Sequence, residues 1–203
     1  MTVDHVLRPT VVPPNRFTQA SIGWQPWLEP VAEEELTAGQ RDALIDAARA
    51  KSEYFRLLAR DPAILKARTL ADKDIHDNQD SGLPRGEREF AAAATSRVNG
   101  CIFCASVHSR FAAHFLGDPS EVTRLLDQGV QADLSARHRA IVDAARALTR
   151  TPIAFGAEHV AALRRVGLDA LAIADLVQAS AFFNWANRLM LSLGEPDATG
   201  VRV

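Results

Sequence analysis

The apolar residues of this chain fall into segments rich in Ala and Leu, which are separated by short polar stretches containing Pro, Gly, Asp or Asn. No segment alternates apolar and polar residues convincingly over the length of a strand. The residues at the segment boundaries are those that cap or stop helices. The pattern therefore predicts an all-α fold, a helical bundle of about eight helices.

Cap signals place the boundaries of these helices. A capping box beginning at Thr37 predicts the start of the first helix, and Asp61 before Pro62 supplies an N-cap for the second. The pair Asn99-Gly100 ends the third helix. The expected helices span residues 37–60, 61–76, 84–98, 101–115, a segment from 118, 135–147, 156–166 and 169–193.

The distribution of prolines divides the chain into parts. Five of the ten prolines lie within residues 1–36, which are therefore expected to form an irregular N-terminal arm. Two tryptophans of this arm, Trp24 and Trp27, are expected to pack against another part of the protein. Residues 37–197 are expected to form one helical domain whose central segment is 84–116, followed by a tail at 198–203.

Composition narrows the class of protein. The chain has 203 residues, of which 47% are hydrophobic, enough to bury a core without disulfides or metals. The net charge of −2, without any basic run, gives no indication of nucleic-acid binding. No apolar stretch approaches the roughly 20 residues that span a bilayer, and the N-terminus lacks the apolar region of a signal peptide. A cytoplasmic protein without a membrane segment is expected.

The only two cysteines, Cys101 and Cys104, lie three residues apart, and His108 follows four residues later. On one helix these three side chains fall within an arc of roughly 60°. Both spacings bring side chains into contact range. An imidazole beside a thiol can accept its proton or hold it as a thiolate. A close cysteine pair of this kind is redox-active or metal-binding in most cytosolic proteins.

The position of the cysteines within the helix matters as well. If Asn99 is the N-cap, both cysteines lie in the first one and a half turns, where the helix dipole stabilises a thiolate. Peroxide reduction needs one thiolate that attacks the O–O bond and becomes a sulfenic acid. It also needs a second thiol that condenses with the sulfenic acid to a disulfide.

Glu89 is a candidate proton acceptor upstream of the cysteines. On a continuous helix it would lie about 18 Å from Cys101 along the axis. The break at Asn99-Gly100 allows the chain to reverse and bring Glu89 close to His108. The apolar run after Glu89 places the carboxylate at the border of the core, where it could take a proton from Cys104 through His108 or a water.

The run EREFAAAATSRVNGCIFCASVHSRFAA, with Glu89, Cys101, Cys104 and His108 in their places, resembles the alkylhydroperoxidase-D and carboxymuconolactone decarboxylase superfamily. The later stretch AFFNWANRLMLSLGEPD, which contains Asn184, is similar to the C-terminal signature of its peroxidase-related branch. The resemblance covers about residues 37–197.

The resemblance implies an all-α bundle that forms homo-oligomers and reduces organic hydroperoxides or hydrogen peroxide. It implies Cys104 as the attacking thiol, Cys101 as the resolving thiol, and a proton relay through Glu89 and His108. It implies no cofactor and no metal, and a thiol or protein reductant that the sequence does not identify. The well-known member has a second histidine between its cysteines, whereas this chain has Phe103. The relay is therefore expected to be shorter and the pocket more apolar.

Other readings of the same residues remain open. The dithiol could serve a redox sensor or a disulfide-exchange protein without peroxide turnover. Cys101, Cys104 and His108 could instead bind structural zinc, with Glu89 or His114 as the fourth ligand. A c-type haem is excluded because the residue after the second cysteine is Ala105 and not histidine. The cysteine pair also argues against lactone decarboxylation, because that branch of the family lacks it.

Overall fold

A computed structural model describes residues 6–201 of the chain. Residues 1–5 of the expected arm and 202–203 of the expected tail lie outside the described part. Within it the fold is all-α, as the sequence predicts, with nine α-helices, three short 3-10 helices and one small antiparallel sheet. No helix in the described part is both long and apolar enough to cross a membrane.

The helices and strands have the following bounds. The α-helices are α1 (Ala38–Ala43), α2 (Glu53–Leu58), α3 (Pro62–Asp77), α4 (Arg85–Asn99), α5 (Ile102–Leu116), α6 (Ser120–Gln128), α7 (Ala136–Thr149), α8 (Ala157–Arg165) and α9 (Ala170–Leu193). The 3-10 helices span Glu33–Glu35, Ala47–Lys51 and Gly129–Gln131, and the strands are β1 (Gly23–Pro26) and β2 (Gly194–Asp197).

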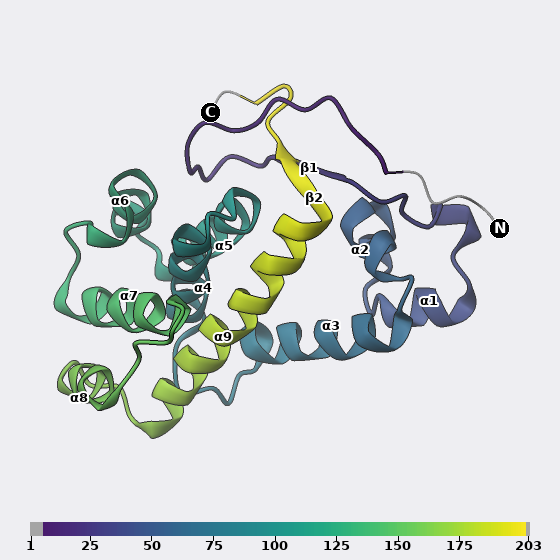
Figure 1. The fold of residues 1–203 in the computed structure, drawn as a ribbon. Coiled ribbons are helices and arrows are strands. Elements are labelled where there is room, and N and C mark those ends of the chain that lie inside the picture. Colours follow the sequence, from purple (N-terminus) through teal and green to yellow (C-terminus); the bar gives the residue numbers. More distant parts are fainter. Residues whose placement is uncertain (1–5, 202–203) are drawn as a thin grey trace.

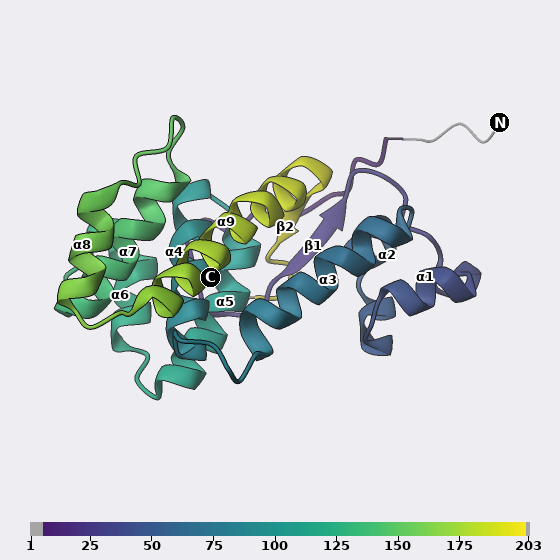
Figure 2. The same cartoon turned by 90° about the horizontal axis from the view of Figure 1, so that it is seen from below.

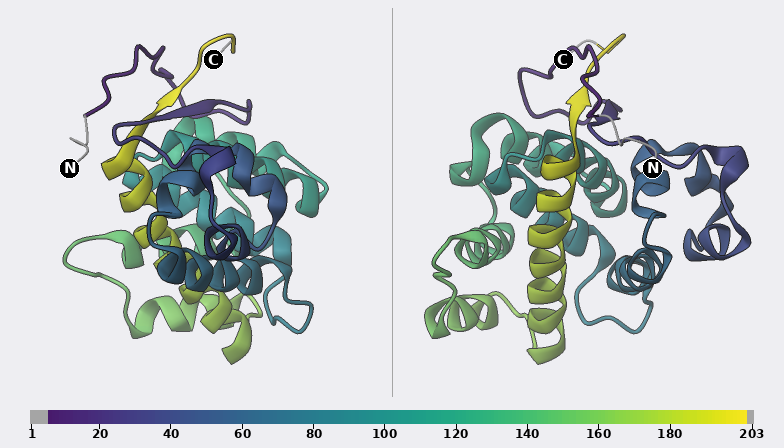
Figure 3. Two further views of the ribbon diagram at one scale, coloured as in Figure 1. Left: turned by 90° about the vertical axis from the view of Figure 1, so that its right-hand side faces the viewer. Right: turned by 45° about the vertical axis from the view of Figure 1, so that its right-hand side comes forward.

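Helix α9 runs through the middle of the molecule (Figure 1). Helices α4 to α8 gather on one side of it, and α1 to α3 form a smaller group on the other side (Figures 1 and 2). Beyond the end of α9 the chain continues into β2, which pairs with β1 across the top of the bundle (Figure 3). The molecule therefore has two helical groups joined by α9 and covered by the two terminal segments.

The largest cluster of buried apolar side chains lies among α4 to α9. Its centre is α4, where the run Ala91–Ala94 is completely buried. Small side chains let the neighbouring helices approach α4 closely, and α4 contacts α5, α7 and α9. This burial explains why Glu89, one position before Phe90 on the same helix, is shielded from solvent.

The single helix expected over residues 37–60 is wrong. The capping box at Thr37 is present, but α1 ends at Ala43 and Ile45 adopts a positive φ of 63°. Asp46 then caps a 3-10 helix, and extended Ser52 precedes α2. Asp and Ser side chains favour such local caps over helix continuation, and this competition interrupts the apolar pattern.

The arm also contains a strand, which the sequence pattern does not indicate. Four residues of β1 pair with four of β2, too few to show alternation. A Cβ on Gly194 would lie 2.2 Å from the carbonyl oxygen of Gln25 and 2.4 Å from the Trp24 ring, so only glycine fits there. The Trp24 indole is buried and donates a hydrogen bond to the carbonyl of Met190 at 3.2 Å. The expectation that Trp24 packs onto the protein is confirmed.

Candidate functional site

The cysteine pair lies at the tight turn between α4 and α5. Gly100 has a φ of 78° and ends α4, because glycine adopts this left-handed conformation at low cost. The N-cap of α5 is Cys101, whereas the sequence suggested Asn99. The Cys101 sulfur accepts a hydrogen bond from the backbone N–H of Cys104 at 3.4 Å. The Cys101 sulfur thereby satisfies one of the backbone donors at the start of α5.

The two sulfur atoms lie 2.8 Å apart, and both cysteines are free thiols. Cys101 is 1% exposed and Cys104 is 6% exposed, within an apolar cluster that includes Trp24, Tyr54 and Met190. Only Cys104 of the pair lines the neighbouring cavity. The two thiols are therefore inequivalent: one faces a cavity and the other lies behind it.

The Cys104 thiol is held in its protonated form. Its hydrogen bond with Cys101 raises its pKa well above the usual range, and burial adds to this effect. The Asn187 amide and the Arg68 charge act in the opposite direction with smaller effect. Two interacting thiols lose their protons in two steps that belong to the pair. Removing a proton from the second sulfur costs the most free energy, because the first sulfur beside it is already negative.

Glu89 and His108 form the second part of the site. The reversal at Gly100 packs α4 against α5, so that His108 Nδ1 lies 2.6 Å from Glu89 Oε2. Burial alone would raise the pKa of Glu89, but the hydrogen bond to His108 and the nearby His76 and Arg85 hold it below its usual value. Glu89 is thus a buried carboxylate paired with an imidazole, which the structure brings together as expected.

Cys104 and His108 both line the same cavity, one helical turn apart on α5. The described residues contain no direct hydrogen bond between them. Since Nδ1 of His108 faces Glu89, Nε2 is the nitrogen that remains available to exchange a proton with the cavity.

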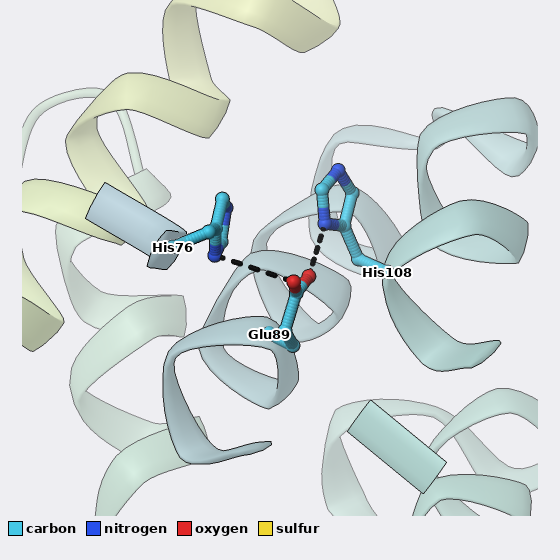
Figure 4. A group of neighbouring side chains, drawn as sticks. All are labelled: His76, Glu89 and His108. Atoms are coloured by element: carbon cyan, nitrogen blue, oxygen red, sulfur yellow. Dashed lines mark hydrogen bonds and ion pairs between the residues drawn. The ribbon is translucent and has the colours of Figure 1, made fainter. Parts of the chain in front are cut away.

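His76, at the end of α3, is a member of the site that sequence reasoning missed. Figure 4 shows its ring pointing at Glu89 from the side opposite His108, with Nδ1 3.5 Å from Glu89 Oε1. The two imidazole rings stack with centroids 5.4 Å apart. No local motif links His76 to residues 13 or more positions away, and only the packing of α3 against α4 brings it there.

His76 is neutral near physiological pH. Its side chain is 6% exposed, and burial lowers its pKa to about 4, against the opposing charge of Glu89. Among the described residues neither ring nitrogen has a hydrogen-bond partner. The carboxylate of Glu89 therefore lies between one hydrogen-bonded and one unbonded imidazole.

The same three residues could hold a metal ion. Ligand atoms of His76, Glu89 and His108 lie within 4.8 Å of one another, and two histidines with one glutamate form a known catalytic zinc set. Arg85, whose Nε lies 3.5 Å from Glu89 Oε1, opposes a cation there. The zinc set considered from the sequence, Cys101 and Cys104 with His108, does not form such a cluster in the described part of the chain.

A cavity of about 360 Å³ opens beside Cys104. Its apolar wall includes Phe103. This agrees with the more apolar pocket that was expected because Phe103 stands in place of a second histidine. Other aromatic lining residues are Tyr54, Phe55, Phe111 and Phe183. Its volume lies within the roughly 300–1,000 Å³ of small-molecule sites.

Side-chain amides, of which Asn187 is fully buried, support the turn that carries the cysteines. Asn99 Nδ2 donates to Asn184 Oδ1 at 3.1 Å and to Asn187 Oδ1 at 3.0 Å, and Asn187 Nδ2 donates to Ser96 Oγ at 3.0 Å. Asn184 also donates to Thr149 Oγ1 at 3.2 Å. Asn184 and Asn187, which belong to the stretch AFFNWANRLMLSLGEPD, therefore link the end of α4 to α9 through hydrogen bonds.

Comparisons with known proteins agree with this fold. Residues 62–147 match the model of the Carboxymuconolactone decarboxylase family. No curated protein sequence matches the chain.

Several solved structures are similar. A peroxidase-related protein with an alkylhydroperoxidase AhpD core from Ralstonia eutropha JMP134 is 24% identical, with a TM-score of 0.67 over 84% of this chain and 87% of that one. A peroxidase-related protein from Silicibacter sp. TM1040 is 26% identical, with a TM-score of 0.65 over 79% and 85%. A variant of the debrominase Bmp8 in complex with 2,3,4-tribromopyrrole is 18% identical, with a TM-score of 0.62 over 81% and 87%.

The fold and the site together define an all-α protein with a dithiol at a helix start and a buried glutamate–histidine pair. The match over residues 62–147 and the similarity of the fold to AhpD-like, peroxidase-related proteins support a relationship to the alkylhydroperoxidase-D and carboxymuconolactone decarboxylase superfamily.

Proposed function

We propose that the protein is a thiol-dependent peroxidase that reduces organic hydroperoxides or hydrogen peroxide. The observation that carries the proposal is the shared cavity: the thiol of Cys104 and the imidazole of His108 line it together. Cys101 lies directly behind Cys104, and Glu89 lies behind His108. A nucleophile and its resolving partner are thus next to a proton relay.

The chemistry consumes one peroxide and two thiols. The Cys104 thiolate attacks the terminal peroxide oxygen, the O–O bond breaks, and an alcohol leaves as the sulfur becomes a sulfenic acid. The Cys101 thiol then attacks that sulfur, releasing water and forming the Cys101–Cys104 disulfide. The 2.8 Å between the sulfurs lets this second step occur with little movement. A thiol or protein reductant of unidentified kind returns two electrons.

Proton transfer links these steps. Nε2 of His108 accepts the Cys104 proton, directly or through one water, while Glu89 stabilises the imidazolium. The imidazolium then gives the proton to the departing alkoxide. This transfer is needed because the pKa of Cys104 is raised by its hydrogen bond with Cys101 and by burial. His108 takes no net proton over the cycle.

Burial favours this reading over disulfide exchange with a protein. Cys104 is 6% exposed at the wall of a small cavity, and Cys101 is 1% exposed. A peroxide reaches such a sulfur more readily than a folded partner's disulfide does. A redox sensor without turnover remains the alternative, and repeated consumption of peroxide in the presence of excess dithiol reductant distinguishes the enzyme from it.

The test is a count of free thiols on reduced, metal-free protein before and after one equivalent of an organic hydroperoxide. Loss of both thiols within seconds, reversed by a dithiol reductant, is the expected result. Two thiols that survive the peroxide would reject the peroxidase and redirect attention to disulfide exchange.

Single cysteine variants then assign the roles. Cys104→Ser is expected to abolish turnover, because the remaining thiol does not face the cavity. Cys101→Ser is expected to undergo one oxidation and stop at the sulfenic acid, which a sulfenic-specific label and intact mass detect. Turnover by Cys104→Ser would contradict the assignment of the attacking thiol.

A further inference from the structure

One side of the cavity is lined by buried polar groups that lack partners. Nη1 of Arg49, the hydroxyl of Tyr54, and Nε and Nη1 of Arg68 have no hydrogen-bond partner among the described residues. These three side chains come from a 3-10 helix, α2 and α3, and converge on the cavity that Cys104 also lines. A native protein satisfies nearly all its buried polar groups, so a cluster of unsatisfied ones on a cavity wall indicates a site that binds a polar group.

Arg68 is the central member of this cluster. Its side chain is 7% exposed, and its guanidinium lies over the rings of Phe55 at 5.6 Å and Phe182 at 5.3 Å. These rings fix the guanidinium plane, so its donors are already oriented. A buried cation of this kind is costly unless an anion accepts its hydrogen bonds.

The carboxylate nearest to Arg68 does not meet this need. Asp72 Oδ2 lies 3.5 Å from Arg68 Nη1 and 3.9 Å from Arg49 Nη2, distances of ion pairs and not of good hydrogen bonds. One carboxylate shared by two guanidiniums leaves one positive charge. Further along the wall Asp77 is shared in the same way by Arg85 and Lys73, at 2.7 and 3.3 Å.

The unsatisfied atoms also define the chemistry of the ligand. A guanidinium can only donate hydrogen bonds. Tyr54 keeps its proton because burial raises its pKa to about 12, so it too can donate. The complementary group is an anion with several acceptor oxygens, such as a carboxylate, which arginine binds through two parallel hydrogen bonds. The remaining wall is aromatic and suits an apolar body.

We infer that the cavity binds hydroperoxides that carry a carboxylate, with Arg68 and Arg49 holding the carboxylate and the peroxide end directed at Cys104. The reaction is unchanged: the carboxylate takes no part, the O–O bond breaks, and the products are a hydroxy acid, water and the disulfide. The choice of hydroperoxide as reacting group rests on the proposed function. The carboxylate site rests only on the geometry of the cavity.

The cavity size limits the substrate. About 360 Å³ accommodates an aromatic or short aliphatic acid, but not a phospholipid or a peptide. Aromatic and aliphatic acids present the same carboxylate, so both are included as separate arms of the test.

The first experiment measures selectivity in steady-state turnover. Cumene hydroperoxide is compared with its para-carboxylate and with a six-carbon hydroperoxide bearing a terminal carboxylate, in the intact protein and in Arg68→Met. The ratio of kcat/KM for each acid to that for the neutral peroxide is expected to fall roughly 10- to 100-fold in Arg68→Met. The change is expected mainly in KM, and Arg68→Lys should restore part of it.

The matched control is Arg165→Met, which removes an exposed arginine on α8 outside the cavity. Its selectivity ratios are expected to equal those of the intact protein. Equal ratios in Arg68→Met and the intact protein would overturn the inference, because a purely structural role would lower turnover of acid and neutral peroxides alike.

The second experiment separates this inference from the proposed function. Calorimetry measures binding of the unreactive hydroxy acid product, and of its methyl ester, to the reduced protein. Binding of the acid but not of the ester, lost in Arg68→Met, supports the carboxylate site. If the same protein turns over no peroxide, only the proposed peroxidase function is rejected. Turnover of peroxides without preference for the acid, and equal binding of acid and ester, would reject the carboxylate site alone.

Discussion

The two histidines that flank Glu89 have different hydrogen-bonding surroundings. His108 is hydrogen-bonded to the carboxylate, whereas His76 has no hydrogen-bond partner among the described residues, and burial lowers its pKa to about 4. His76 is therefore a neutral side chain beside the carboxylate, and the proposed relay passes through His108. The relay predicted from the sequence thus has an uncharged neighbour that the sequence did not reveal.

The depressed pKa of His76 has a consequence for stability. In the unfolded chain this histidine takes up a proton near pH 6.5, but in the folded protein only near pH 4. The unfolded state therefore binds more protons between these values, and the free energy of unfolding is expected to fall by up to ~3 kcal/mol as the pH drops through this window. Glu89, whose pKa is also lowered, adds a further loss below its ordinary value.

Urea denaturation at a series of pH values measures this dependence. His76→Gln removes the titrating group and is expected to flatten the slope between pH 6.5 and 4, while the loss below pH 4.5 remains. An unchanged slope in His76→Gln would show that His76 is not protonated on unfolding in that range.

Glu89 is expected to matter for the rate and not for the peroxide preference. Glu89→Gln keeps the size of the side chain but removes the charge that stabilises the His108 imidazolium. The rate constant for thiol oxidation should fall roughly 10²–10⁴-fold. Stopped-flow measurement of Trp fluorescence or of thiol loss checks this. A rate within a few-fold of the intact protein would remove Glu89 from the relay.

At the scale of helices and strands, the caps were the most predictable features. The start of α3 at Asp61-Pro62 and the stop of α4 at Gly100 follow from local chemistry alone, and both are found. The interruption after Ala43 was missed, because the apolar pattern continues through Ile45 while the backbone there turns to positive φ. Side chains that cap the local helix ends determine the backbone in that region, and the spacing of apolar residues does not reveal such caps.

The same distinction applies to the candidate site. Cys101, Cys104 and His108 share one helix, so their spacing reveals them, and Glu89 follows once the turn at Gly100 is recognised. Arg68 and His76 belong to α3, whose position against α4 and α9 depends on tertiary packing. A single sequence carries no local signal for such residues.

The pairing of β1 with β2 depends on one glycine. Gly194→Ala would place a methyl group 2.2 Å from the Gln25 carbonyl and against the Trp24 ring. The backbones must separate, and we expect destabilisation of about 1–3 kcal/mol together with release of Trp24 from its buried site. Thermal unfolding and the emission wavelength of Trp fluorescence measure both effects.

Gly39→Ala is the control for this substitution. No atom lies within 4 Å of a Cβ built on Gly39, and this residue lies in α1, where alanine favours the helix. A Gly194→Ala protein as stable as Gly39→Ala, with unshifted emission, would show that the two strands can adapt to the methyl group.

At the scale of the whole molecule, the site is shared among distant parts of the chain. The cysteines lie at the start of α5, and the proposed proton relay spans α4 and α5. Arg49 and Arg68, which line the cavity, belong to the smaller helical group. Helix α9 lies between the two helical groups, as the different views in Figures 1 and 3 show. The candidate site residues recognised in the sequence therefore lie at α4 and α5, and other segments complete the cavity beside them.

The association of several chains, which the resemblance implied, stays a prediction, as do the reductant and the cytoplasmic location. Light scattering of the purified protein measures the number of chains directly. The cavity described above is formed by residues of one chain.

The cover over the cysteine pair has a consequence for how the protein is assembled during synthesis. Trp24 belongs to the same buried cluster as both cysteines. It is hydrogen-bonded to Met190, and its strand pairs with β2; these partners are made about 90 residues after Cys104. At typical rates of translation, about 5–20 residues per second, the two thiols emerge several seconds before the segment that closes over them exists. The thiol pair therefore passes through a period in which it is present but unshielded, and closure of its cover belongs among the last steps of folding.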